Sequence, residues 1–289
     1  MRYADVVKKA QEIVSKRGAD NKSGKVPLFA CETWLKGDQI NLWSYWQGYQ
    51  IKDMDKGIDI LLVGQDWGNP DRYPDSVSRI EEIQAGNKSV NYFSDASKTD
   101  ENLAELFEIL GCNIRKPVYD KRILFTNYCL GYRKGKESGG MTKTQLSMDK
   151  ELFNDLVEAV KPKIIICLGK IVYEAVTGHV AHDFSKQISA GLPFASEYPG
   201  NKHIKVYGVA HCGALGSKNA GGLDNMKKAW RVIAKDNGYL ENVVVLKRED
   251  GTRLYLTEGE NGQLVVRTSK DPGSSCIYSA DLFCRLMGI

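Results

Sequence analysis

Four continuous apolar runs, rich in β-branched residues, indicate a layered α/β protein. They are IDILLV (58–63), RILFTNY (122–128), KIIICLG (163–169) and IKVYGVAH (204–211). Runs that are apolar without strict alternation are typical of parallel strands covered on both faces. We therefore expect a central, mainly parallel four-stranded sheet.

Helical periodicity separates and follows these runs. Apolar residues recur at intervals of three and four positions, as on the buried face of a helix. Asp224 is expected to cap the last helical segment and Gly238 to end it. Strands that alternate with helices predict a three-layer α/β/α fold. The helical segments are 1–18, 101–110, 149–160, 169–178 and 223–238.

The character of the sequence changes after about residue 240. The stretch NVVVLKREDGTRLYLTEGENGQLVVRTS contains short β-rich runs that are interrupted at Asp250-Gly251 and Asn261-Gly262. These dipeptides are typical of hairpin turns. The chain is thus predicted to divide into an α/β domain over residues 1–240 and an antiparallel β-hairpin extension over 241–289.

Composition narrows the class of protein. With 26% charged and 42% hydrophobic residues, the 289-residue chain has the balance of a soluble globular protein. No apolar run approaches the ~18 residues of a membrane span, and the N-terminal segment is an amphipathic helix rather than a secretory signal. We expect a cytoplasmic protein that does not bind membranes. The seven cysteines are scattered without a C-x-x-C pair, so no disulfide framework, metal or cofactor is expected.

Charge is distributed unevenly along the chain, although the formal net charge is only +4. Residues 111–150 contain nine Lys and Arg against three Asp and Glu, whereas residues 81–110 contain seven acidic residues against two lysines. Such runs are usually solvated surfaces, and the basic one becomes functionally interesting only if it borders a site.

Polar side chains follow the apolar runs at the point where each predicted strand ends. The first run leads to Gln65 and Asp66, the second to Asn127, the third to Gly169 and the fourth to His211. Ligands of open α/β sheets bind outside the carboxyl ends of the strands. A carboxylate, an amide and an imidazole would meet at one edge if the strands are neighbours with the same direction.

Five motifs, in this order and strand context, resemble those of the uracil-DNA glycosylase superfamily. They are GQDWG (64–68), NYFSD (91–95), LFTNY (124–128), KPKIIICLG (161–169) and HCGALG (211–216). The family hydrolyses the bond between uracil and its sugar in DNA, and such an enzyme must flip the nucleotide out of the stack. The resemblance implies a monofunctional DNA glycosylase of base excision repair that acts on uracil or a related deaminated base. We expect it to be a monomer.

The resemblance implies catalytic roles for two residues. Asp66 would orient a water and stabilise positive charge on the sugar. His211 would donate to the uracil O2 as negative charge develops on the leaving base, and a neutral imidazole suits that role. Gln65 would present its backbone amide to the base along a tight path that Gly64 permits. The plainer alternatives are an aspartate that caps a turn and a structural histidine.

Base recognition would depend on Asn127 and Phe93. The amide of Asn127 can accept from N3–H and donate to O4 of uracil, whereas cytosine presents the reverse pattern. Phe93 would stack on the flipped base, and Tyr92 is an alternative for that role. A turn asparagine and a core aromatic are the corresponding structural interpretations.

The resemblance also implies contacts to DNA. Leu215 matches the family's leucine that wedges into the duplex where the base has left. Lys218 would bind phosphate, and the basic residues Arg133, Lys134 and Lys136 would flank the crevice and contact phosphate oxygens.

The sequence departs from the family after the acid. The best-known members have Pro and Tyr there, and the tyrosine excludes thymine; this chain has Trp67 and Gly68. Another branch has glycine at the second position but asparagine in place of the acid. Selectivity for uracil would then require Trp67 or Tyr73 to fill the space that Gly68 leaves.

Other interpretations stay open. One alternative is a nucleic-acid- or nucleotide-binding protein that has the glycosylase fold but lost or altered catalysis. Another is a different α/β enzyme that acts on a small molecule. His179 and His182 form an H-x-x-H pair without an evident third metal ligand. Cys212 beside His211 would be a nucleophile only if its side chain shared the face of the histidine, which alternation along a strand opposes.

Overall fold

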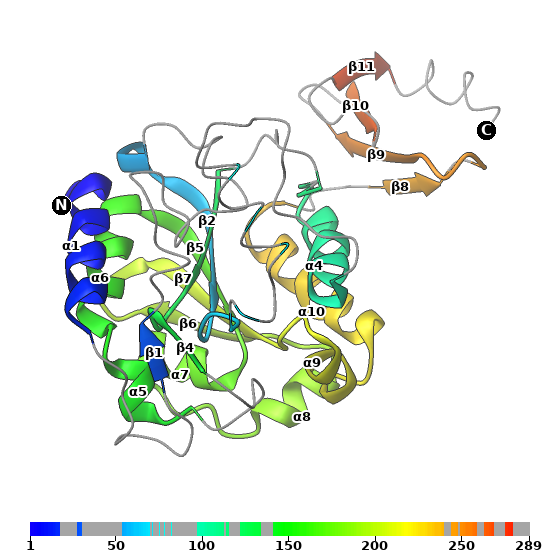
Figure 1. Ribbon diagram of the computed structural model, residues 1–289. Helices are drawn as coiled ribbons and strands as arrows, with labels where there is room; N and C mark the ends of the chain where they lie inside the picture. The colour runs from blue at the N-terminus through cyan, green and yellow to red at the C-terminus, as the bar shows by residue number, and fades with distance from the viewer. Residues whose placement is uncertain are drawn as a thin grey trace.

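The structure is a computed structural model, and its helices and strands are shown in Figure 1. It describes residues 1–17, 28–30, 54–69, 71, 75, 78, 82, 97–112, 114–115, 122–133, 141–239, 244–247, 249–258, 263–268 and 275–279. Expectations for Tyr73, Tyr92, Phe93, Lys134 and Lys136 fall outside these residues.

A five-stranded sheet forms the centre of the molecule. Its strand order is β3-β2-β5-β7-β6, and β3, β2, β5 and β7 are mutually parallel. The three-layer α/β/α fold is thereby confirmed, with the four predicted strands side by side. The strands are β2 (Ile58–Gly64), β3 (Ile123–Asn127), β5 (Pro162–Leu168), β6 (Phe194–Tyr198) and β7 (Asn201–Val209).

The fifth strand, β6, was not predicted. It pairs antiparallel with β7 at the edge of the sheet, and its residues alternate between half-buried and exposed until Tyr198. Its sequence, FASEY, lacks the continuous apolar character of the inner strands because an edge strand is only partly covered.

Helices cover both faces of the sheet (Figure 1). Neighbouring residues of β7 identify the two faces. The hydroxyl of Tyr207 accepts a hydrogen bond from Asn237, just after α10 (Leu223–Asp236). Gly208 lies against the ring of Tyr173 in α7 (Lys170–Thr177). On the α7 side lie α6 (Lys150–Val160) and α1 (Tyr3–Lys16), which packs on α6. The opposite face carries α4 (Lys98–Ile109) and α10 (Leu223–Asp236).

Short helical elements complete the layers. These are a 3-10 turn η2 (Met54–Lys56), α5 (Lys143–Ser147), α7 (Lys170–Thr177), α8 (Phe184–Ser189) and α9 (Ala214–Asn219). In the described part of the chain, none of the helices combines the length and apolar character that a membrane crossing requires.

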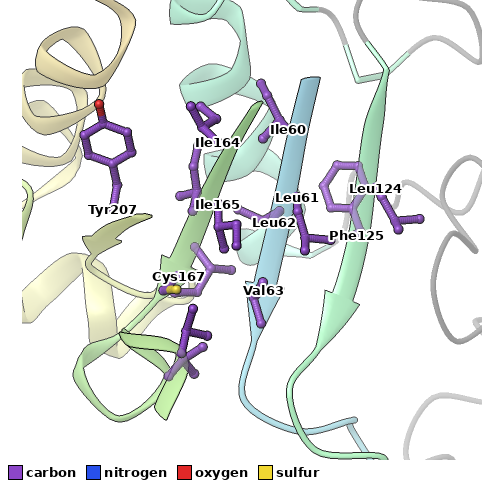
Figure 2. Close-up of a cluster of buried hydrophobic side chains, with 14 of the residues drawn as sticks. Ile60, Leu61, Leu62, Val63, Leu124, Phe125, Ile164, Ile165, Cys167 and Tyr207 are labelled. Carbon is purple, nitrogen blue, oxygen red and sulfur yellow. The ribbon is translucent and has the colours of Figure 1, made fainter. Parts of the chain in front are cut away.

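The continuous apolar runs of the inner strands lie at the centre of the core (Figure 2), and helix residues pack around them. Ile60, Leu61 and Ile165 are fully buried, and a side chain of this kind contributes about 1.5–3 kcal/mol on burial. Phe107 of α4 packs on Phe125 of β3 with ring centroids 5.4 Å apart. This contact places α4 on the face of the sheet beside β3.

The start of α10 corrects one prediction. Its N-cap is Gly222, and Asp224 lies inside the first turn. A carboxylate in the first turn still favours the helix through the macrodipole, so the acid stabilises the helix start without capping it. Gly238 lies two residues beyond the end of the helix with φ of 66°, as expected for a residue that ends it.

Two further sheets are antiparallel. The first pairs β1 (Leu28–Ala30) with β4 (Gly131–Arg133). The second has the order β11-β10-β9-β8, and the turn between β8 and β9 is closed by Asp250 Oδ1, which accepts the N–H of Thr252 at 2.9 Å. Its strands are β8 (Val244–Lys247), β9 (Arg253–Glu258), β10 (Gln263–Thr268) and β11 (Ser275–Ser279). Asn261-Gly262 lies outside the described residues.

Candidate functional site

The carboxyl ends of the four parallel strands form one edge of the sheet. The strand order places Asn127 at the end of β3, Gln65 and Asp66 after β2, Gly169 after β5, and His211 after β7. Adjacent strands lie about 4.8 Å apart, so the ends of β2 and β7 are separated by about 10 Å. Gly169 stands between them and has no side chain.

The pairing of β2 with β3 continues beyond the sheet. Gly64 O accepts from Tyr128 N at 2.9 Å, Gln65 O accepts from Cys129 N at 3.0 Å, and Trp67 N donates to Gly131 O at 2.9 Å. These hydrogen bonds hold segments 65–67 and 128–131 side by side. The position of Asp66 is therefore set by the chain that follows Asn127.

Gly64 lies directly against the side chain of Asn127. The two residues are partners in the β2–β3 register, and a Cβ atom at Gly64 would collide with Asn127 Oδ1. Only glycine allows this close approach. Asn127 is a half-buried residue, and its side-chain amide is therefore held against the end of β2, beside Gly64.

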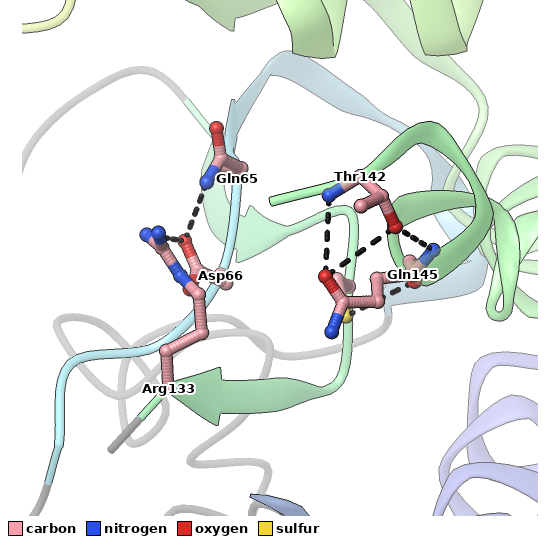
Figure 3. A network of polar contacts seen from close by, with 6 residues as sticks. Gln65, Asp66, Arg133, Thr142 and Gln145 are labelled. Carbon is pink, nitrogen blue, oxygen red and sulfur yellow. Dashed lines mark hydrogen bonds and ion pairs between the residues drawn. The ribbon is translucent and has the colours of Figure 1, made fainter. Parts of the chain in front are cut away.

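Asp66 forms a bidentate ion pair with Arg133 (Figure 3). Arg133 Nε donates to Oδ2 at 2.6 Å and Nη2 donates to Oδ1 at 3.1 Å, while Gln65 Nε2 donates to Oδ1 at 3.0 Å. The side chains of Asp66 and Arg133 are only 8% and 3% exposed. Bidentate pairing of a guanidinium with a carboxylate fixes both groups in one plane.

The position of Arg133 differs from the expected one. We anticipated a guanidinium at the rim that contacts phosphate oxygens, but the side chain is buried and bound to Asp66. The sequence did not reveal this because Arg133 lies within a basic stretch that looks like a solvated surface. Its partner, 67 residues earlier in the chain, becomes a neighbour only through the β2–β3 pairing.

A second buried ion pair supports the segment that follows Asn127. Asp149 Oδ2 accepts the backbone N–H of Leu130 at 2.6 Å and is paired with Arg17, whose Nη1 lies 2.9 Å away. Asp149 is fully enclosed. The sequence carries no signal for this role, because an aspartate just before a helix is usually interpreted as a cap.

His211 has a defined tautomer in its neutral form. The backbone N–H of Gly213 donates to His211 Nδ1 at 3.0 Å, and a backbone N–H can only donate. The neutral ring must therefore carry its proton on Nε2. Although the residue as a whole is exposed, the chain around the ring desolvates it and lowers its pKa below the ordinary value of 6.5. The site thus favours an uncharged imidazole that donates through Nε2.

Helix α4 and Gly216 hold the loop that carries His211. Asn102, buried on α4, donates through Nδ2 to the carbonyl of Cys212 at 2.7 Å. A Cβ atom at Gly216 would collide with the backbone carbonyl of His211, so α9 starts in direct contact with the histidine. The sequence analysis did not single out Asn102. Its signal in the sequence is that a polar residue lies on the apolar stripe of α4, where a buried amide needs a hydrogen-bond partner.

The remaining residues of this loop have contrasting environments. Leu215 is 58% exposed on α9, and Lys218 is exposed on the last turn of the same helix. Cys212 is fully buried; burial raises the pKa of its thiol, and the nearby charge of Asp100 adds to the effect. A buried thiol of this kind is a poor nucleophile.

Trp67 belongs to the main hydrophobic core, with only 5% of its surface exposed. Its backbone pairs with Tyr132 in an isolated parallel bridge. Gly68 follows at a half-buried position. A tryptophan packed in the core anchors the start of this loop, and its role in base selectivity stays a prediction.

His179 and His182 are both exposed, and His179 Nδ1 lies 3.2 Å from the hydroxyl of Ser196. Among the residues that the structure describes, no group of three or more His, Cys, Asp or Glu is arranged to hold a metal ion.

The fold and this edge define an α/β protein with a polar site at the carboxyl ends of parallel strands. The chain matches no protein-family model, and no curated protein is significantly similar to it.

Proposed function

We propose that the protein is a DNA glycosylase that hydrolyses the N-glycosidic bond of uracil, or of a related deaminated base, flipped out of DNA. The observation that supports this most is the strand order β3-β2-β5-β7 with all four strands parallel. It brings the amide of Asn127, the carboxylate of Asp66 and the imidazole of His211 to one edge, the set of groups that the motifs suggested.

The three groups suit different parts of one reaction. The bond between base and sugar breaks with its electron pair moving to the base, and the Nε2–H of His211 would stabilise the charge that develops on O2. The carboxylate of Asp66 would stabilise the positive sugar until a water adds its oxygen to the sugar carbon. The proton released by the water balances the charge on the base.

Recognition of the base would depend on Asn127. Its side chain lies against Gly64, so the amide is limited in where it can point. An amide fixed in this way matches uracil through one acceptor and one donor, and it leaves mismatched polar groups with cytosine.

A second function is favoured by the contacts of Asp66. Its two carboxylate oxygens already accept three N–H donors from Gln65 and Arg133, which limits its freedom to bind a water. This supports the alternative of a nucleic-acid- or nucleotide-binding protein that keeps the fold with altered catalysis.

Excision from uracil-containing oligonucleotides separates the two functions. The purified protein is incubated with single-stranded and duplex DNA that carries uracil opposite A or G, and abasic product is measured. We expect product from the wild type and a loss of about 10²- to 10⁴-fold in rate for Asp66→Asn, typical of losing acid–base or charge assistance.

Asn127→Ala is the companion variant because it leaves the Asp66–Arg133 ion pair in place. It should also lose excision while its circular dichroism spectrum and unfolding midpoint stay near those of the wild type. DNA binding without abasic product from any of these substrates would favour the binding function instead.

A further inference from the structure

The Arg133 guanidinium occupies a built position rather than a surface one. Its Nε and Nη2 bind the two oxygens of Asp66, and the side chain is almost fully enclosed. Figure 3 shows the guanidinium of Arg133, on β4, directed at the carboxylate from the segment after β2. Two segments that are distant in the chain, the one after β2 and β4, therefore meet where Arg133 binds the predicted catalytic acid Asp66.

The backbone around Arg133 is fixed on both sides. Arg133 is the register partner of Leu28 in the β1–β4 sheet, and its neighbour Tyr132 bridges to Trp67 in the core. Leu130, three residues earlier, is bound to the buried Asp149. The backbone that carries the Arg133 side chain is thus anchored by β1 and by the bridge between Tyr132 and Trp67.

From this geometry we infer that Arg133 is the positioning residue for Asp66, and that it holds the carboxylate in its working orientation instead of binding a DNA phosphate. This inference rests on the proposed glycosylase function. A bidentate fork restricts both the position and the plane of a carboxylate, which a lysine cannot do because it is a point charge.

Because the Asp66–Arg133 pair is buried, Arg133 should not leave Asp66 to bind a DNA phosphate. Withdrawal of the guanidinium would leave a carboxylate that is 8% exposed without its charged partner, and breaking one side of a buried ion pair is strongly unfavourable. Arg133 should consequently contribute to the rate of the chemical step and little to the electrostatic part of DNA binding.

The test compares Arg133→Lys and Arg133→Gln with the wild type in single-turnover excision and in DNA binding at several salt concentrations. We expect both variants to lose about 10²-fold in the excision rate, as for a misplaced catalytic group. Dissociation constants and their salt dependence should stay unchanged. A residue that contacts one phosphate would instead reduce the slope of log K against log salt by about 0.9.

The matched control is Arg122→Gln. Arg122 precedes β3 at the amino-terminal ends of the parallel strands, away from the predicted site, and its Nε donates to Gly57 O at 2.7 Å. Its loss should leave excision unchanged. Asp66→Asn combined with Arg133→Gln should be no slower than Asp66→Asn alone, because residues that act through one group are non-additive. This double variant also removes both charges and so guards against misfolding of Arg133→Gln.

The outcomes distinguish this inference from the proposed function. A wild type without excision activity overturns both. An active wild type whose Arg133→Lys variant excises normally, or binds DNA with a smaller salt slope, overturns the positioning role alone. Additive losses in the double variant would also overturn it.

Discussion

At the scale of single residues, hydrogen bonding and solvation select the chemical form of the site. Gly213 N–H fixes Nδ1 of His211 as an acceptor, and desolvation lowers the pKa of the ring. Protonation of His211 at Nδ1 would break the hydrogen bond from Gly213 N–H, and the charged ring would lack the hydration that it has in water. The neutral donor that the motifs implied is thus the form that the loop itself stabilises.

The pH dependence of excision should report this state. Because the folded pKa of His211 lies below 6.5, neutral imidazole and activity should persist as pH falls through 6.5, and be lost only at lower pH. The sign for stability is the same: the unfolded chain binds the proton more readily, so the contribution of His211 to unfolding free energy falls as pH drops below about 6.5.

The measurement is an NMR titration of the His211 ring, assigned by its loss in His211→Gln, together with the acidic limb of the rate profile. An acidic limb centred above pH 6.5 would contradict the environment described for His211.

At the scale of elements, the site depends on how two strands leave the sheet together. β2 and β3 stay hydrogen bonded past their ends, through Tyr128, Cys129 and Trp67. This extension brings Asp66 to Arg133, and the last register pair of the two strands places Asn127 against Gly64. The same pairing therefore determines the positions of Asp66, of its partner Arg133 and of the Asn127 amide.

Gly64→Ala tests this extension. The added methyl group should push away the Asn127 amide, with a loss of about 10²-fold in excision and about 1–3 kcal/mol in unfolding free energy from overpacking. Urea unfolding and single-turnover excision measure the two effects.

The control for Gly64→Ala is its combination with Asn127→Ala. If the collision with Asn127 is the cause, Gly64→Ala should have little further effect on stability once that side chain is truncated. Equal destabilisation in both backgrounds would show that the methyl group disturbs the backbone instead.

At the scale of the whole molecule, the described residues of the C-terminal sheet lie outside the main hydrophobic core. Among the described residues, the main core extends from Tyr3 to Ala234 and does not include the buried Leu254 and Val266 of the C-terminal sheet. Strands β8–β11 pair only with one another within that described part. The division at about residue 240 stays a prediction, and these pairings favour it.

Removal of residues 241–289 should leave the α/β part folded. We expect the 1–240 chain to unfold cooperatively with a midpoint close to that of the full chain, since little core would be lost. Thermal unfolding followed by circular dichroism measures this. A chain that is expressed but lacks a cooperative transition would contradict the predicted boundary.

The sequence alone determined the layers and the inner strands. Continuous apolar runs such as IDILLV must be covered on both faces, and the 3.6-residue periodicity of segments such as 149–160 matches helices that cover them. It also determined that Asp66, Asn127 and His211 lie at or just beyond strand ends. It did not determine β6 or β1, because partly covered edge strands and three-residue strands carry little hydrophobic signal.

Only the tertiary structure decided the partners within the site. Arg133 and Asp66 are 67 residues apart in the chain. Many other charged residues lie as far from each of them, and the local sequence around Asp66 or Arg133 does not indicate which one becomes its partner. The choice follows from strand register, which is set by long-range pairing and by burial of the surrounding chain. The sequence placed Asp66 just beyond the carboxyl end of β2, and the long-range pairing of β2 with β3 decided that the buried guanidinium of Arg133 binds it there.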